Sequence, residues 1–322
     1  MRKKNIYLAY FFMCIILVIT SNCKKEEKEL TPTLKTLDIT EITSNSASCG
    51  GDISSDGGAA IIAKGVCWST TQMPTITDSK TSDGVSLGSY TSSITGLTAG
   101  TTYYVRSYAI NSAGTAYGNE INFTTIPTSI SDIDGNSYHT IIIGNQVWLA
   151  ENLKTTKYRD GTSITNIIDN TSWSNSTTGA YCYYDNDISY ANDYGALYNF
   201  YAIADSRNIC PAGWHIPSDN EWTTLTTFLG GESEAGAKLK EVGNDHWDYP
   251  NSGTNSSGFA ALPGGERYNN GTFHGSHMLG IWWTSTTYYN AVWMRHVSNN
   301  GSQLFRSIDN KEFGFSVRCI KD

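Results

Sequence analysis

Three of the five histidines in the second half of the chain lie close enough in sequence to be considered as zinc ligands. His274 and His277 stand close together in "FHGSH", and His246 precedes them. A zinc site needs three or four protein ligands at a recognisable spacing, and no third ligand follows this pair. We therefore expect these histidines to lie in solvent-exposed loops without a metal.

The segment "DNDISYAND" gathers the oxygen-bearing side chains that calcium prefers. Asp185, Asp187, Asn192 and Asp193 all lie within it. The segment lacks the glycine and the terminal glutamate of an EF-hand loop, and aspartate-rich turns also form without metal. We expect no cofactor, and a calcium site at Asp185, Asp187 and Asp193 is the alternative.

Aromatic residues form a third group, because tyrosine and tryptophan combine a large apolar area with a polar tip. The candidate ligand-binding residues are Trp247, Tyr249, Trp283, Tyr288 and Tyr289. Neighbouring side chains that could add directional hydrogen bonds are Asn251, Asn255, Asn269 and Asn270. In "IWWTST" adjacent tryptophans point to opposite sides of a strand, so we expect one in the core and Trp283 exposed. The sequence thus predicts a binding face in the loops from about 244 to 293.

The stretch "CPAGWHIPSDNEWTTL" places a histidine between two tryptophans and at first suggests a catalytic site. However, Ser218 and Glu221 have the spacing of a capping box, in which each side chain bonds a free amide at a helix start. The carboxylate of Glu221 is then occupied. Apolar residues at helical spacing follow at Trp222, Leu225, Phe228 and Leu229, before "GG" ends the helix. We predict a structural junction between a strand and a helix.

The candidate residues need a folded framework, and a length of 322 residues is enough for two domains. Short runs rich in Val, Ile, Thr and Tyr, separated by turn clusters, predict an all-β sandwich over residues 36–126. Residues 127–133 form a linker. Residues 134–322 combine a hairpin at Gly144-Asn145 with short β-like runs, which indicates an α+β domain. One amphipathic helix is predicted with Leu197, Phe200, Tyr201 and Ala204 on its apolar face.

The N-terminus predicts export and lipid anchoring. "MRKK" followed by the apolar run Ile6 to Ile19 is typical of a signal peptide over residues 1–22. "TSNC", with Asn22 where a small residue is usual, resembles a bacterial lipobox that ends on Cys23. A tether over residues 23–35 then begins with "KKEEKE", which resembles a surface-export signal of Bacteroidetes lipoproteins. A plain secretory signal is the alternative. The expected location is the outer membrane, lipid-anchored and surface-exposed.

The formal charge of −8 and the pI of about 5.2 argue against a nucleic-acid partner, which would need a positive surface. Two parts of the chain resemble known families. "GLTAGTTYYVRSYAINSAGTAYG" is similar to the late strands of a fibronectin type III domain, with Tyr103 in the tyrosine-corner position. The resemblance implies a spacer domain.

The second resemblance covers residues 131–322. "SYHTIIIGNQVWLAENL", "ICPAGWHIPSDNEWTTL", "GFAALPGGER", "WWTST" and "FGFSVRCIKD" resemble, in this order, the Fibrobacter succinogenes major paralogous domain. That family is similar to C-type-lectin-like proteins and to formylglycine-generating enzymes, whose signature has arginine where this chain has His215. The resemblance implies a lectin-like α+β fold but no defined biochemical role.

The lectin-like resemblance also bears on the cysteines. Such folds bring their chain ends together, which implies a disulfide between Cys210 and Cys319. Cys49 and Cys67 could pair or remain buried thiols, and Cys182 has no assigned partner. Residues 250–318 contain no cysteine to act as the nucleophile of a formylglycine-generating enzyme. The sugar-binding Glu-Pro-Asn and Gln-Pro-Asp tripeptides of calcium-dependent lectins are also absent from the sequence.

The sequence therefore predicts a surface lipoprotein whose lectin-like head recognises a glycan or a protein without catalysis. An envelope hydrolase or transferase and a purely structural envelope protein are the alternatives. An enzyme would show converging carboxylates or a serine–histidine pair beside a pocket, whereas a binding module would show exposed aromatic and polar groups without them.

Overall fold

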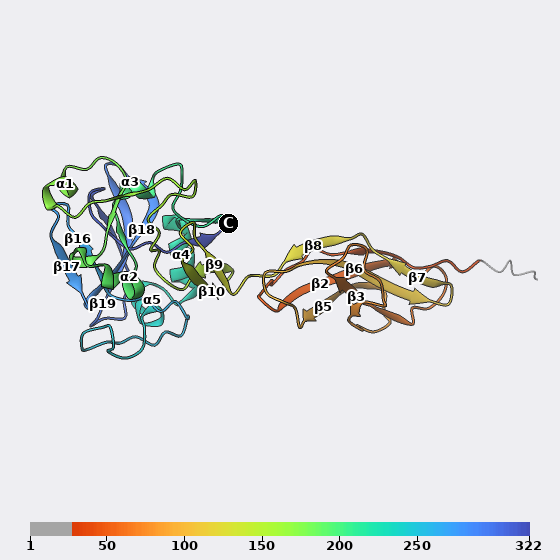
Figure 1. Ribbon diagram of the computed structural model, residues 1–322. Coiled ribbons are helices and arrows are strands. Elements are labelled where there is room, and N and C mark those ends of the chain that lie inside the picture. The colour runs from red at the N-terminus through yellow and green to blue at the C-terminus, as the bar shows by residue number, and fades with distance from the viewer. Residues whose placement is uncertain (1–27) are drawn as a thin grey trace, which may run out of the picture.

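Two antiparallel sheets face each other in the N-terminal part of the computed structural model, which describes residues 28–322 (Figure 1). One sheet has the order β1-β2-β5 and the other β4-β3-β6-β7, with β8 also paired to β6. The strands are β1 (Thr33–Thr36), β2 (Ser46–Ser55), β3 (Ala63–Ser69), β4 (Ser79–Lys80), β5 (Gly88–Thr95), β6 (Thr102–Asn111), β7 (Gly114–Tyr117) and β8 (Ile121–Thr124). The predicted fibronectin-like β-sandwich is confirmed.

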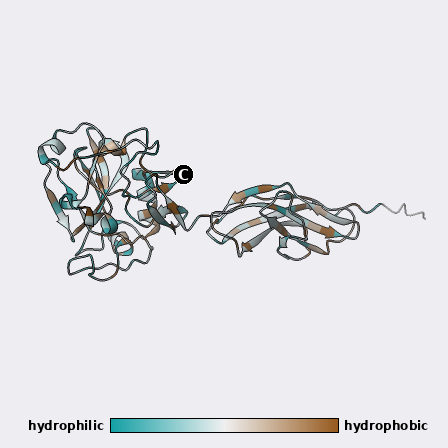
Figure 2. Cartoon of the chain, viewed as in Figure 1, coloured by the Kyte–Doolittle hydropathy of each residue, from teal (hydrophilic) through white to brown (hydrophobic). Residues whose placement is uncertain are grey.

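Alternating residues of the facing strands form the sandwich core, and hydrophobic residues alternate with hydrophilic ones along these strands (Figure 2). Val66, Ile94 and Val105 are fully buried there. The Tyr103 hydroxyl accepts a hydrogen bond from the Thr98 backbone N–H at 3.1 Å, which is the bond that defines a tyrosine corner.

The boundaries of the sandwich differ from those predicted. β1 begins within the predicted tether and ends at Thr36, the first residue of the predicted sandwich, and its backbone pairs with β2 from Thr33 onward. β9 (Ser129–Ser131) lies within the predicted linker and pairs with the strand that follows it. Both segments were too polar to be recognised as strands. The predicted signal peptide and Cys23 lie outside the described residues.

Cys49 and Cys67 are separate buried thiols, which settles the alternative left open by the sequence. Burial raises the pKa of each thiol to about 11. Cys182 is also a free, buried thiol, and burial raises its pKa to about 12. Since the thiolate is the reactive form, these cysteines are chemically quiet.

The C-terminal part is built from several small sheets. The sheet nearest the sandwich has the order β15-β21-β11-β10-β9, and it joins the two ends of this part. Its further strands are β10 (Ser137–Ile143), β11 (Gln146–Leu149), β15 (Trp214–His215) and β21 (Ile320–Lys321). The predicted hairpin at Gly144-Asn145 is confirmed by the pairing of Ile143 with Gln146.

A three-stranded meander forms the centre of the C-terminal part. It consists of β18 (Leu279–Tyr288), β19 (Ala291–Ser298) and β20 (Phe305–Asp309). Two smaller sheets flank it. They contain β12 (Thr165–Asn166), β13 (Ala180–Cys182), β14 (Leu197–Tyr198), β16 (Gly264–Arg267) and β17 (Phe273–Ser276).

Helices are short and few in the described chain. They are α1 (Asn170–Ser174), α2 (Ala191–Tyr194), α3 (Phe200–Ile203), α4 (Asp219–Phe228) and α5 (Glu232–Leu239), with 3-10 turns η1 (Tyr184–Asn186) and η2 (Ile188–Tyr190). No helix of the described residues is long and apolar enough to cross a membrane.

The predicted capping box is confirmed at α4, where Ser218 and Glu221 bond each other's backbone N–H. Trp222, Leu225 and Leu229 are buried as expected, but Phe228 is 64% exposed. The single amphipathic helix predicted near residue 200 is wrong. Gly195 ends α2, Leu197–Tyr198 pairs as a strand with β13, and the Asn199 side chain caps α3.

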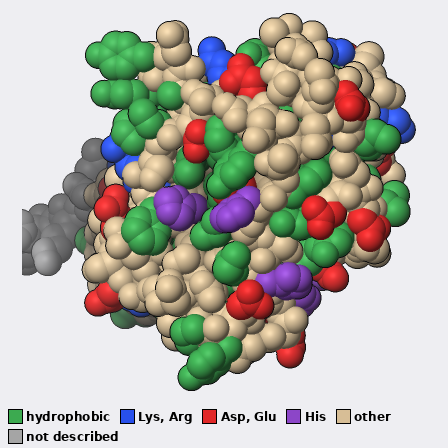
Figure 3. Space-filling model, turned by 90° about the vertical axis from the view of Figure 1, so that its left-hand side faces the viewer, with side chains coloured by type: hydrophobic (Ala, Val, Ile, Leu, Met, Phe, Trp, Pro, Cys, Tyr) green, Lys and Arg blue, Asp and Glu red, His purple; other side chains and the backbone are tan. Residues whose placement is uncertain are grey.

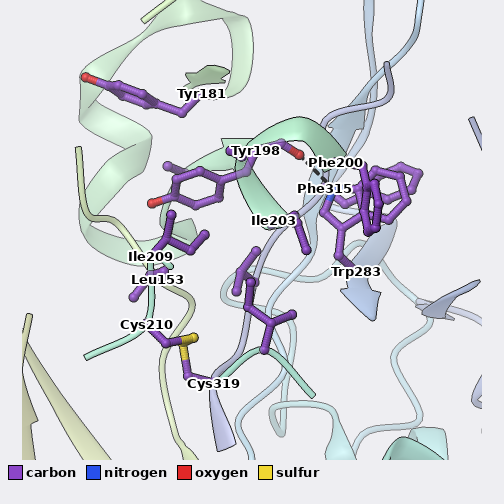
Figure 4. Close-up of a cluster of buried hydrophobic side chains, with 14 of the residues drawn as sticks. Leu153, Tyr181, Tyr198, Phe200, Ile203, Ile209, Cys210, Trp283, Phe315 and Cys319 are labelled. Carbon is purple, nitrogen blue, oxygen red and sulfur yellow. Dashed lines mark hydrogen bonds between the residues drawn. A yellow bond between two sulfur atoms is a disulfide. The ribbon is translucent and has the colours of Figure 1, made fainter. Parts of the chain in front are cut away.

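The first half of β18 is buried on both faces, from Gly280 to Thr284. Trp283 lies in one hydrophobic cluster with Phe200 and Phe315, and Trp282 lies in another with Trp222 and Phe259. Figure 4 shows the first cluster, with the indole of Trp283 against the two phenylalanine rings. The predicted disulfide between Cys210 and Cys319 is confirmed in the same cluster, with the two Cα atoms 5.9 Å apart.

Candidate binding site

The predicted binding face does not form one surface. The loop that carries Tyr249 lies at the start of β18, where the Asp248 N–H donates to the His277 carbonyl at 2.8 Å. Tyr288 ends the same strand, ten residues long. Because a strand rises about 3.4 Å per residue, Tyr249 and the pair Tyr288 and Tyr289 lie roughly 30 Å apart. They cannot contact one small ligand together.

Two of the predicted contact residues are core residues. Trp283 is fully buried, and its indole N–H donates to the Tyr198 carbonyl at 2.7 Å. Trp247 is 1% exposed, and its indole N–H donates to the Ala261 carbonyl at 3.1 Å. Trp282 and Trp283 lie in different hydrophobic clusters, as the predicted alternation requires. The prediction that one of these two sides of β18 meets solvent is wrong. Both faces are covered, so Trp283 cannot bind a ligand.

The neighbouring asparagines are used inside the protein. Asn251 donates to the Glu241 carbonyl at 2.8 Å and accepts from the Gly253 N–H at 2.9 Å. Asn255 accepts from the Ala260 N–H, and Asn270 accepts from the Thr272 N–H. These side chains shape tight turns, while Asn269 is exposed without such a bond. The asparagines therefore do not form the predicted polar ring around a ligand.

What remains of the predicted face is an aromatic ladder at the turn between β18 and β19. Tyr289 is 89% exposed and Tyr288 is 44% exposed. Their ring centroids are 4.8 Å apart, and Tyr288 is 5.1 Å from the half-buried Trp293. The guanidinium carbon of Arg306 lies 3.5 Å from the Trp293 ring centroid, a cation–π contact. We call Tyr288, Tyr289, Trp293 and Arg306 the hairpin tip.

Tyr289 occupies a backbone conformation that is unfavourable for its type. Its φ is 52°, in the left-handed region where glycine or asparagine is usual. Tyr289 and Asn290 connect Tyr288 to its partner Ala291, so the strain falls on the turn itself. A two-residue hairpin turn requires a positive φ, and a bulky, exposed residue is unusual at such a position.

The junction at residues 217–219 holds the hairpin tip in place. β18 has a bulge between Trp283 and Thr287, a feature that often redirects a strand near a functional site. Within this bulge the Ser285 N–H donates to the Pro217 carbonyl at 2.9 Å, and the Thr286 hydroxyl accepts from the Asp219 N–H at 3.0 Å. The opening of α4 therefore positions the tip.

Asp219 also orients the arginine of the tip. Its carboxylate receives Arg306 at 2.8 and 3.0 Å and the buried Arg295 at 2.8 Å. Burial acts to raise the pKa of Asp219, but the two arginines outweigh it and lower the pKa. The carboxylate stays ionised, so Arg306 is held flat against Trp293.

His215 supports the same junction. Its two ring nitrogens lie 2.6 Å from Asp322 and 2.9 Å from Glu221. Burial acts to lower its pKa, but the hydrogen bonds to the two carboxylates raise it above its ordinary value. His215 thus bridges the last residue to the capping box of α4.

The predicted metal candidates do not gather. Asp187 caps η2 by accepting from the Ser189 N–H, and Asp185 stands at a turn with φ 50°. Within residues 28–322 no group of three histidine, cysteine or acidic side chains is arranged to hold a metal ion. The calcium alternative at Asp185, Asp187 and Asp193 therefore has no site in this geometry.

The three histidines have separate internal partners. His246 lies 2.8 Å from Glu241, the ring N–H of His277 donates to the His246 carbonyl at 2.8 Å, and His274 lies 3.8 Å from Glu266. Figure 3 shows histidine side chains beside acidic ones on one face, where hydrophobic side chains occur in small separate groups.

The sequence analysis did not identify Glu266, a buried carboxyl group whose raised pKa is typical of a general acid or base. It is 7% exposed on β16, and burial together with the Asp309 charge raises its pKa to about 7. It also missed Arg306 as part of the hairpin tip. No local pattern marks Arg306, because the residues it contacts are far away in the sequence.

The family model of the Fibrobacter succinogenes major domain matches residues 141–321. No curated protein matches the sequence.

Solved structures show only distant similarity. The sixth fibronectin type III domain of human fibronectin type III domain containing protein 3 is 20% identical and covers 33% of this chain and 95% of its own, with a TM-score of 0.26. The sensor domain of the anti-sigma factor RsgI4 in Pseudobacteroides cellulosolvens is 16% identical and covers 31% of this chain and 99% of its own, with a TM-score of 0.24.

Proposed function

The chain belongs to the Fibrobacter succinogenes major domain family, and we propose that its C-terminal part is a recognition module that binds a partner at the cell surface without catalysis. The observation that carries this proposal is the hairpin tip. Its strained tyrosine, the edge-to-face and tilted contacts of its rings and its oriented arginine lie together at the β18–β19 turn and on the strands beside it.

The chemistry of the hairpin tip favours a protein partner over a glycan. Tyrosine, tryptophan and arginine are the residue types that contribute most to protein interfaces. The tip contains all three, and Asp219 holds Arg306 ready for contact. It contains no carboxylate, histidine, serine or cysteine, the residues that most often carry out hydrolysis or group transfer. A glycan that stacks on the exposed rings is the second ligand class.

The rest of the molecule presents this module. The proposal includes a C-type-lectin-like fold for the C-terminal part and a fibronectin type III-like spacer before it. Cleavage before Cys23 and acylation of its thiol would anchor the chain in the outer membrane. Two acyl chains or more give stable membrane attachment without a membrane-spanning helix. The spacer would then hold the recognition module away from the lipid surface.

A photocrosslinking experiment tests the proposal with a matched control. Tyr289 and Tyr249 are almost equally exposed, at 89% and 85%, but only Tyr289 belongs to the hairpin tip. A photoreactive phenylalanine is placed at either position in the full chain, which is then illuminated with the isolated outer-membrane fraction. We expect a discrete crosslinked protein or glycan from position 289 and none from position 249.

Equal crosslinking from both positions would contradict the proposal, because it would reflect exposure alone. Crosslinking from position 249 only would place the binding surface on the loop at the other end of β18.

A further inference from the structure

A cavity of about 360 Å³ opens beside the end of α3, away from the residues of the hairpin tip. Tyr201, Ala204, Asp205 and Arg207 line it, together with residues of the segments 158–165 and 177–179. Ligand pockets begin at about 300 Å³, so this cavity has room for one or two sugar units.

The charged groups of the cavity neutralise each other. Arg207 donates to Asp205 through Nε at 2.9 Å and through Nη2 at 2.7 Å, a two-point ion pair. The hydrogen bonds from Arg207 lower the pKa of Asp205 to about 2, so the pair persists over the physiological range. A charged ligand would have to displace one partner from the other. The pair therefore favours an uncharged ligand.

The guanidinium group is held rigidly in this pair. It lies over the Tyr158 ring, with its carbon 3.8 Å from the ring centroid, and Nη1 donates to the Thr162 hydroxyl at 2.9 Å. Gly179 is required for this arrangement, because a Cβ atom there would lie 1.9 Å from the Tyr158 hydroxyl oxygen. Because a guanidinium group has five N–H donors and three are used, two remain for a ligand.

The other residues that line the cavity include four with free hydroxyl groups. The side chains of Ser163, Thr165, Thr177 and Thr178 line the cavity and make no hydrogen bond to any other described side chain or backbone group. A hydroxyl group both donates and accepts, which matches the hydroxyl groups of a sugar. The Tyr201 ring adds an apolar surface, while its own hydroxyl donates to Glu312 at 2.8 Å.

We propose that this cavity binds a neutral sugar residue, such as the end of a glycan chain. The free hydroxyls and the spare N–H groups of Arg207 would bond the sugar hydroxyls, and the paired charges would exclude acidic and basic sugars. This site shares no residue with the hairpin tip. Its success or failure is therefore independent of the function proposed for the tip.

The test uses the full chain and a panel of methyl glycosides. Neutral glucoside, galactoside, mannoside, xyloside and N-acetylglucosaminide are compared with galacturonate and glucosamine by saturation-transfer NMR and titration. We expect at least one neutral glycoside to bind. Thr165→Val with Thr177→Val, which removes two exposed hydroxyls, should weaken that binding at least tenfold.

Two further variants complete the test. Ala204 is exposed at the cavity, so Ala204→Trp should fill it and abolish binding while the melting temperature stays unchanged. Tyr289→Ala should leave glycoside binding unchanged. The proposal is overturned if no neutral glycoside binds, if a folded Ala204→Trp variant binds as the wild type does, or if a charged sugar binds more tightly than every neutral one.

Discussion

Tyr289 combines an unfavourable backbone conformation with high exposure to solvent. Glycine or asparagine would adopt its φ of 52° with less strain, and the turn exposes 89% of the tyrosine side chain. Neither burial nor hydrogen bonding therefore explains a large aromatic residue there. The ring meets the Tyr288 ring edge to face, with the two centroids 4.8 Å apart, so both rings are held in a defined arrangement.

Glu266 gives a residue-scale prediction for stability against pH. Its pKa is raised from 4.5 to about 7 by burial and by Asp309, and His274 at 3.8 Å is too exposed to reverse this. Between these two pKa values the folded state holds a proton that the unfolded state has lost. Stability from this group is therefore present below pH 4.5 and is lost as the pH rises through about 7.

Glu266→Gln should remove this dependence, because the amide has the shape of the protonated acid. Urea unfolding at several pH values from 4.5 to 8 is the measurement. We expect the variant to be more stable than the wild type at pH 8 and to lose less stability across the range. An identical pH profile for the two proteins would show that Glu266 titrates normally.

Buried cations hold the loops of the C-terminal part together at the scale of its elements. The Lys240 ammonium group, at the end of α5, donates to the carbonyls of Ser298, Asn299 and Gly301 at 2.8–2.9 Å. The fully buried guanidinium of Arg318 likewise donates to the carbonyls of Leu149 and Phe259. Backbone carbonyls in irregular loops need donors, and these cations supply several each.

Lys240→Met should destabilise the C-terminal part by at least about 2 kcal/mol, because it leaves several buried carbonyls without a donor. Lys154→Met is the control, since the ammonium group of Lys154 bonds no other described residue, and we expect a change below about 0.5 kcal/mol. The measurement is urea unfolding followed by tryptophan fluorescence. Equal stability of the two variants would mean that Lys240 does not support the loops.

The elements that the sequence predicted are those specified by neighbouring residues. The capping box at Ser218 and Glu221 spans four residues, and the turn at Gly144-Asn145 spans two, so both could be read directly. The helix near residue 200 failed because Asn199 caps a new helix and bonds the Ala180 N–H, nineteen positions away. A local pattern of apolar residues contains no information about a partner so far away in the sequence.

The candidate site was predictable only in part for the same reason. Exposed aromatic residues at 288 and 289 were identified from residue type, but the burial of Trp283 depends on which layers cover β18. The contact of Arg306 with Asp219 joins positions 87 residues apart. Such long-range pairings follow from the register of β19 and β20, which no local pattern specifies.

At the scale of the whole molecule, the chain combines a β-sandwich with a loop-rich part that carries both candidate sites. The Cys210–Cys319 disulfide closes a span of 109 residues across the second part, and β21 joins its end to β11 and β15. The disulfide joins the segment before α4 to the end of the chain, and such a cross-link stabilises a region with short helices and small sheets. It also keeps the junction at α4, and hence the hairpin tip, in a constant position.

Recognition of a partner by the hairpin tip is tested most directly by comparing the affinities of three full-length proteins for that partner. Wild type, Tyr289→Ala and Tyr249→Ala are titrated against the partner captured at position 289. We predict that Tyr289→Ala weakens binding by about thirtyfold, the loss expected for an interface residue worth about 2 kcal/mol, while Tyr249→Ala stays within about twofold. Wild-type affinity in a folded Tyr289→Ala protein, or chemical conversion of the partner during binding, would contradict the account.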